Sequence, residues 1–324
     1  MTRRRSDEAN GGYSTAKECI VLTKYVVKRV FLAIVTMFLI CLITFFAMNA
    51  IPGGPFNGEK AKSPAIMKVL NERYNLDKPV IVQFGYYMKN LLHGDFGVSL
   101  KTGRDIRQTI NESFVVSARI GAWAMLIAII VGIVLGSIAA LMRNKWPDRV
   151  IVFFATLATA MPSFVLASLL LLLFCIKLKW IPVWNSTNHN YILPVLSLSL
   201  YPMAYITRLT KTSMLDVLGQ DYIRTARAKG VAAWKVIFKH GLRNALIPVI
   251  TYVGPMTASI LTGSLVIEKI FTIGGLGSKF VDCITNRDYT MIMGTTIFLA
   301  TLMVVMNLLS DLVYKLVDPR IKLE

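Results

Sequence analysis

Six long stretches of this chain contain no Asp, Glu, Lys or Arg, and this feature restricts its possible folds more than any other. Each stretch is close to the roughly 17 to 25 residues that an α-helix needs to cross the hydrocarbon core of a membrane. The chain is also 55% hydrophobic, which is high for a soluble domain. We therefore expect an all-α integral membrane protein with six transmembrane helices, at about residues 30–51, 120–142, 150–176, 191–207, 245–267 and 289–310.

The fourth stretch is the shortest and contains Pro194 and Pro202, so a re-entrant segment is the alternative there. Charge favours a full span. With six spans and the N-terminus inside, the cytoplasmic segments hold 21 Lys and Arg, and the outer segments hold 14. Removing the fourth span would place the basic loop 207–245 outside, against the tendency of positive loops to stay in the cytoplasm. The prediction is six spans with both termini cytoplasmic.

The segments around the spans suggest three regions. Residues 1–24 are polar and are expected to form a mobile cytoplasmic tail, residues 25–318 the transmembrane domain, and residues 319–324 a cytoplasmic C-terminal tail. The outer loop, residues 52–118, is expected to be structured. Apolar residues recur at helical spacing from Val80 to Leu91 before Gly94, and a shorter apolar helix is predicted at residues 66–70.

Several functional classes are disfavoured by what the sequence lacks. The six stretches contain no Asp, Glu, Lys, Arg or His, whereas proton-coupled transporters and voltage sensors carry such groups within the membrane. There is neither a His-Glu-x-x-His motif nor a phosphate-binding Gly-x-x-x-x-Gly-Lys-Ser/Thr loop, and the four cysteines are scattered. We expect no enzyme activity, bound cofactor or metal site in this chain. The net charge of +18 flanks hydrophobic helices, which favours contact with membrane lipid over nucleic acid.

The loop at residues 207–245 is the strongest candidate functional site. It is 39 residues long, more than a turn between two helices requires, and its pattern predicts a helix, a break at Gly230 and a second helix through Trp234 and Phe238. Small residues among basic ones favour close contact with a cytoplasmic partner, and a positively charged helix at the membrane surface is the alternative. The residues predicted to make the contact are Asp221, Tyr222, Arg224, Thr225, Ala226, Arg227, Ala228, Lys229 and Gly230.

Hydroxyl side chains within the spans are candidates for a solute path. Most such residues serve close helix packing, but uncharged hydroxyls would also suit a solute with varied side chains. Prolines at 162, 194, 202, 248 and 255 add places where a helix can kink. The candidate path residues are Ser197, Ser199, Thr251, Thr257, Ser259 and Thr262.

Short motifs along the chain match those of one transporter family. They read YPMAYITRLT at 201–210, DYIRTARAKG at 221–230, HGLRNALIP at 240–248, VIEKIF at 266–271 and GLG at 275–277. Further matches are RDY at 287–289, LDKP at 76–79, GDFG at 94–97 and Ser99. On these motifs, residues 25–318 resemble the first permease subunit of bacterial dipeptide and oligopeptide ABC importers.

This resemblance implies the type I ABC importer permease fold in a bacterial plasma membrane. The partners it implies are a second homologous permease, two cytoplasmic ATPase subunits that bind ATP and Mg²⁺, and an extracellular peptide-binding protein. In the family, the cytoplasmic motif forms a coupling helix that inserts into a groove of an ATPase subunit, a role carried here onto Thr225, Ala226 and Gly230. The implied substrates are oligopeptides or dipeptides.

Alternatives are a permease for nickel chelates or another small solute of the same family, a stand-alone gradient-driven channel, and a membrane-embedded receptor or scaffold. The chain departs from the general importer motif at residues 224–226, where Arg-Thr-Ala stands in place of Glu-Ala-Ala. Pro248 lies farther from Gly230 than in that general pattern. Gly274 stands where relatives commonly have a proline.

Overall fold

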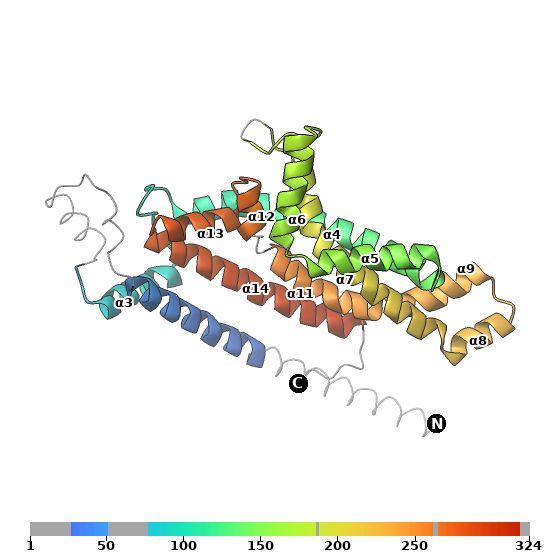
Figure 1. Ribbon diagram of the computed structural model, residues 1–324. Coiled ribbons are helices and arrows are strands. Elements are labelled where there is room, and N and C mark those ends of the chain that lie inside the picture. The colour runs from blue at the N-terminus through green and yellow to red at the C-terminus, as the bar shows by residue number, and fades with distance from the viewer. Residues whose placement is uncertain (1–26, 51–76, 186–187, 262–264, 318–324) are drawn as a thin grey trace, which may run out of the picture.

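The computed structural model describes residues 27–50, 77–185, 188–261 and 265–317. Within these ranges the regular structure is helical, apart from one isolated antiparallel bridge between Val98 and Asp105. Figure 1 shows an elongated bundle with α8 near one end and α3 and α13 near the other.

The described helices, in chain order, are the N-terminal helix Val27–Ala50, α3 (Val80–Leu92), α4 (Ile106–Leu141), α5 (Trp146–Ala160), α6 (Ser163–Leu170), the π-helical segment η1 (Leu171–Lys177), α7 (Ile192–Leu218), α8 (Asp221–Ala228), α9 (Ala233–Lys235), the π-helical segment η2 (Val236–Leu242), α10 (Arg243–Ala245), α11 (Ile247–Leu261), α12 (Leu265–Ile270), α13 (Leu276–Thr285) and α14 (Tyr289–Val317).

Four described helices are long and apolar enough to cross a membrane: the N-terminal helix, α4, α7 and α14. Two further spans are possible as bent pairs. One joins α5 to α6 and η1, and the other joins the helical run at 233–245 to α11. The all-α, multi-pass membrane architecture predicted from the sequence is confirmed. The described helices give four spans, or six if each bent pair is one span, and the six predicted stretches lie on these segments.

The third predicted span, residues 150–176, is not one straight helix, and the proline at 162 lies where it bends. The chain bends by 107° between Ala160 and Ser163. Pro162 lacks the N–H that would continue the helix and disfavours helical dihedrals at the preceding residue. Met161 accordingly adopts an extended conformation, with φ −88° and ψ 137°. As a result α6 stands across the direction of α5 (Figure 1).

Small residues along α4 allow α7 to approach closely. Ala124, Ala128, Gly132 and Gly136 lie four residues apart on one face, and all are buried. A Cβ added to Gly136 would lie 2.5 Å from the carbonyl oxygen of Thr207. In a membrane, such small-residue stripes let helix backbones pack together and gain van der Waals contact. The α4–α7 pair therefore forms the centre of the bundle.

The outer loop is structured, as predicted from the sequence. The apolar pattern from Val80 forms α3, and the chain leaves it through Gly94, which has a φ of +76°. The second predicted span, at residues 120–142, lies on a longer helix, because α4 already starts at Ile106, inside the predicted loop 52–118. Asp105 begins α4 by accepting a 2.8 Å hydrogen bond from the backbone N–H of Gln108. The predicted helix at 66–70 and the tails 1–24 and 319–324 lie outside the described residues.

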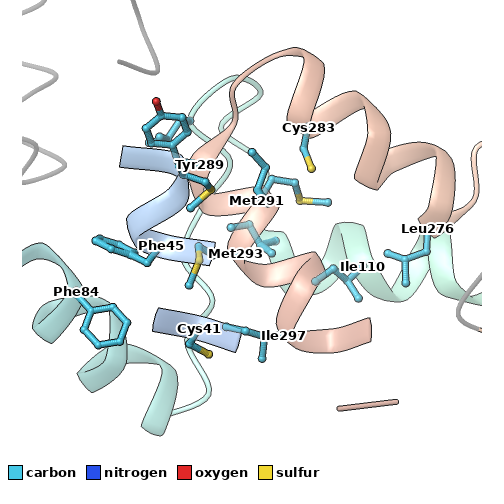
Figure 2. Packing of buried hydrophobic residues seen from close by; sticks show 14 residues of the cluster. Cys41, Phe45, Phe84, Ile110, Leu276, Cys283, Tyr289, Met291, Met293 and Ile297 are labelled. Carbon is cyan, nitrogen blue, oxygen red and sulfur yellow. The ribbon is translucent and has the colours of Figure 1, made fainter. Parts of the chain in front are cut away.

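A cluster of apolar side chains joins the N-terminal helix to α3 and α14 (Figure 2). Phe45 of the N-terminal helix packs at 5.3 Å between ring centroids on Phe84 of α3. Cys41 lies near Ile297, and Met293 lies between the two helices. These contacts place the N-terminal helix along the side of the bundle at the α3 end.

Candidate functional site

The predicted cytoplasmic loop contains a short helix, α8, that is separate from α7. The pattern of Leu215, Leu218, Tyr222 and Ala226 predicts one continuous helix, but the helix ends at Leu218. Gln220 is extended, with φ −73° and ψ 152°, so the chain changes direction before Asp221. Local apolar spacing does not reveal this break, although Gly219 is a signal for it.

Gly230 ends α8 in the way that its position in the sequence suggests. The N–H of Val231 donates to the carbonyl of Ala226 at 3.2 Å, and the N–H of Gly230 donates to Arg227 at 3.0 Å. This is the Schellman arrangement, which requires a left-handed residue, and Gly230 has a φ of +74°. The glycine is needed for its positive φ and not for lack of space, since a Cβ there would meet no atom within 4 Å.

The helices after Gly230 form a base on which α8 rests. Ile223 of α8 and Val236 of η2 are both buried, and the two elements are in contact. The amide of Asn244 donates a 2.9 Å hydrogen bond to the hydroxyl of Tyr222. Asn244 belongs to α10, which precedes α11 after a bend of 46°, so this bond ties α8 to the segment that leads into α11.

The free face of α8 is polar and mostly basic. Asp221, Arg224, Thr225, Arg227 and Lys229 are exposed, and Ala226 is half-buried. Arg224 lies 3.4 Å from Asp221, but both side chains are largely exposed, so this ion pair contributes little. The structure therefore brings the predicted contact residues together on one short helix that projects from the end of the bundle, which we call the basic knob (Figure 1). Of these residues, Tyr222 is bonded to Asn244 on the base.

A buried ion pair fixes the α4–α5 turn to α7. Asp148, in the first turn of α5, is only 5% exposed and is paired with Lys211 of α7. Its other carboxylate oxygen accepts a 3.0 Å hydrogen bond from the N–H of Asn144. Neither residue stands out in the sequence, because each is a charge beside a span and nothing local indicates the pairing.

The predicted path residues lie in different environments. Ser197 and Ser199 are buried in α7, so neither is at the surface of the chain. Thr257 is half-buried and donates to the carbonyl of Val253 at 2.7 Å. Thr262 lies outside the described residues. The two remaining residues, Thr251 and Ser259, line hollows beside α11.

Those hollows adjoin each other and together form one recess along α7 and α11. Each has a volume of about 520 Å³, and they share Met256 and Ser259. Their walls come from the α5–α6 bend, from α7 and from α11. Tyr205 of α7 stacks on Tyr252 of α11 with ring centroids 4.1 Å apart. Tyrosines were not among the residues predicted to line a path.

Two buried carboxylates organise the opposite end of the molecule. Glu268 of α12 accepts hydrogen bonds from Ser117 and from the N–H of Ser278, at 2.7 and 3.0 Å. Asp288 accepts a 2.5 Å bond from the hydroxyl of Ser99 and a 3.1 Å bond from the N–H of Leu100. Glu268, Asp288 and Ser99 lie within the quoted motifs, but the sequence did not indicate which groups they meet.

The described residues contain no gathering of three His, Cys, Asp or Glu side chains suitable for a metal ion. The described candidate regions are instead surfaces and hydrogen-bonded contacts. The exposed basic residues of α8 lie at one end of the bundle, and an uncharged recess runs along α7 and α11. The hydrogen-bonded carboxylates Glu268 and Asp288 lie at the other end.

Comparison with known proteins places this geometry in a family. Residues 132–323 match the family model described as "Binding-protein-dependent transport system inner membrane component", and residues 22–126 match the model for the N-terminal region of such components. The dipeptide transport system permease protein DppB of Bacillus subtilis is 47% identical over 93% of this chain and 99% of its own length. The oligopeptide transport system permease protein OppB of Salmonella typhimurium is 41% identical over 93% of this chain and all of its own length.

Solved structures share the fold at lower sequence identity. A chain of the MetNI methionine ABC transporter, solved in inward-facing conformations, is 14% identical with a TM-score of 0.52, covering 65% of this chain and 97% of its own. A chain of an amino acid ABC transporter crystallised with histidines is 15% identical with a TM-score of 0.51, covering 66% of this chain and 95% of its own. The helical arrangement is therefore that of ABC transporter permeases.

Proposed function

The chain belongs to the family of binding-protein-dependent transport system inner membrane components, and we propose that it is a permease subunit of an ATP-driven importer of oligopeptides or dipeptides. Support comes from relatives named as dipeptide and oligopeptide permeases, which align over 93% of this chain and nearly all of their own length. An alignment of this extent covers the spans, the basic loop and the outer loop together.

The coupling site in this proposal is the knob formed by α8. Two cytoplasmic ATPase subunits bind ATP and Mg²⁺, and one of them holds α8 in a groove. Residues 224–230 contribute the contact, with basic side chains around the half-buried Ala226. The observation that supports this role is the contact of α8 with η2, together with the hydrogen bond between Tyr222 of α8 and Asn244, which lies just before α11. A movement of the ATPase would then tilt α11 against α7 and exchange an inward opening for an outward one.

The remaining partners follow from the same proposal. A second, homologous permease faces the recess along α7 and α11 and completes the path, and an extracellular binding protein delivers peptide. Six spans, with the bent pairs each crossing once, put both termini in the cytoplasm of a bacterial cell. The chain itself binds no nucleotide and catalyses no reaction, so transport depends on the ATPase subunits.

The test is peptide uptake by the complete importer reconstituted in vesicles, with Ala226→Asp in this chain. A carboxylate at the centre of the knob should block docking, so ATP-dependent uptake should fall at least tenfold while the protein stays folded in the membrane. Ala118→Asp is the matched control, because Ala118 is also half-buried but lies at the other end of the bundle, on α4. Normal uptake by the Ala226→Asp importer would contradict the coupling role.

A second readout identifies the substrate class. The parent importer should take up peptides in an ATP-dependent manner and should not transport nickel chelates. Uptake of peptide by the chain alone, without ATPase subunits, would instead indicate a gradient-driven channel.

A further inference from the structure

The recess along α7 and α11 is uncharged. Among the described residues that line its two hollows, none is Asp, Glu, Lys, Arg or His. Tyr201 and Tyr205 lie one helical turn apart on α7 and are 42% and 37% exposed, so their rings form part of its surface. A surface of this kind cannot select a solute by the charge of its side chains, because it contains no opposite charge to pair with.

One hydroxyl in the recess has no hydrogen-bond partner within the described chain. The Tyr252 hydroxyl is buried, while its ring stacks on Tyr205. A buried hydroxyl without a partner is unfavourable, so it favours the binding of a ligand that supplies an acceptor. Tyr252 lines one of the two hollows, so a small movement of its ring would bring this hydroxyl to an acceptor on a solute bound there.

Prolines supply acceptors in the same recess. Pro202 lies inside α7 and Pro255 inside α11, and neither has an N–H. Each therefore removes the helical donor of the carbonyl four residues earlier, which belongs to Leu198 and Thr251 respectively. Leu198 lines one hollow, and Thr251 lines the other. The recess thus combines a hydroxyl donor with backbone carbonyls that lack their usual helical partner.

We propose that this recess binds the main chain of the transported peptide, through the Tyr252 hydroxyl and the carbonyls of Leu198 and Thr251. The hydroxyl donates to a peptide carbonyl, the two carbonyls accept from peptide N–H groups, and the Tyr205 ring packs against a peptide plane. This inference rests on the proposed peptide-import function. Such a site would recognise the main chain, which all peptides share, and would have no preference among their side chains.

The test compares Tyr252→Phe with the parent in the complete reconstituted importer. The substitution removes the donor and keeps the ring that stacks on Tyr205. The probes are three radiolabelled tripeptides, Ala-Ala-Ala, Ala-Lys-Ala and Ala-Glu-Ala, each supplied at a concentration that saturates the binding protein. Because one hydrogen bond is worth about 1 kcal/mol, uptake of all three should fall by a similar factor of about five.

Tyr86→Phe is the control, since that tyrosine is exposed on α3 and lies outside the recess. Unchanged uptake by Tyr252→Phe, or a loss confined to the lysine or the glutamate peptide, would overturn the inference while the parent still imports peptide. A parent importer that hydrolyses ATP but imports none of the three peptides would contradict the proposed function itself, which makes the two failures distinguishable.

Discussion

Ser117 of α4 donates a 2.7 Å hydrogen bond to Oε1 of Glu268 in α12, across 151 residues of chain. The same Ser117 hydroxyl accepts a 2.8 Å bond from the N–H of Leu276, the first residue of α13. Glu268 also accepts from the N–H of Ser278 and is only 3% exposed. One buried carboxylate therefore joins α4 to α12 and α13.

Gly275→Ala should destabilise the protein, because a Cβ there would lie 2.4 Å from Oε2 of Glu268 and 2.6 Å from Oγ of Ser117. Overpacking at such a site costs about 1 to 3 kcal/mol. Gly274→Ala is the matched control, since its Cβ would meet no atom within 4 Å. Thermal unfolding of the two purified variants in detergent measures the difference. Equal melting temperatures would show that the carboxylate does not hold this turn.

Glu268→Gln should reduce the pH dependence of stability. Burial raises the pKa of Glu268 above its ordinary value of 4.5, and outweighs hydrogen bonds from Ser117 and from the backbone N–H groups of Ser278 and Gly277, which lower it. The folded state thus holds the proton more tightly than the unfolded state. The resulting stability is fully present below pH 4.5 and is lost as pH rises through the folded pKa.

The glutamine side chain cannot lose a proton, so the variant lacks the loss of stability that ionisation of Glu268 causes as pH rises. Melting temperatures measured from pH 4 upward should fall less steeply for Glu268→Gln than for the parent protein. Parallel curves would contradict the assignment of the slope to this residue.

Lys211→Met should destabilise the protein strongly, because it leaves the buried carboxylate of Asp148 without its cation. Breaking one side of a buried ion pair costs about 3 kcal/mol. Adding Asp148→Asn removes the unpaired charge, so the double variant should be more stable than Lys211→Met alone. Chemical unfolding of Lys211→Met, Asp148→Asn, the double variant and the parent gives the double-mutant cycle. A double variant less stable than Lys211→Met would refute this account.

Gly230→Val should impair ATP-dependent uptake, whereas Gly230→Asn should retain most of it. The reason is conformational, since Gly230 has a φ of +74° and open space around it. A left-handed conformation costs a side-chain-bearing residue about 1 to 2 kcal/mol, and asparagine tolerates it best. Gly85→Val is the control, because Gly85 also has open space but lies within α3. Similar uptake by the valine and asparagine variants at position 230 would contradict a role for the α8 turn.

Much of the architecture is readable from local patterns. The charge-free stretches predict the apolar helices, the spacing from Val80 predicts α3, and Gly230 marks the end of α8. These features depend on residues within a turn or two of each other, so periodicity and backbone preference are enough to find them. The resemblance in the motifs also predicts the family correctly.

Other features depend on which helices meet. Pro162 marks a kink in the third stretch, but the 107° bend is seen only in the folded chain. Ser197 has the same chemistry as Ser259, yet one is buried in α7 and the other lines the recess. Ser117 meets Glu268, and Ser99 meets Asp288, only because α4 and α14 bring distant segments together. Hydropathy reports the preference of a segment for the membrane, whereas a contact depends on how closely two surfaces fit, as where Gly136 admits the backbone of α7.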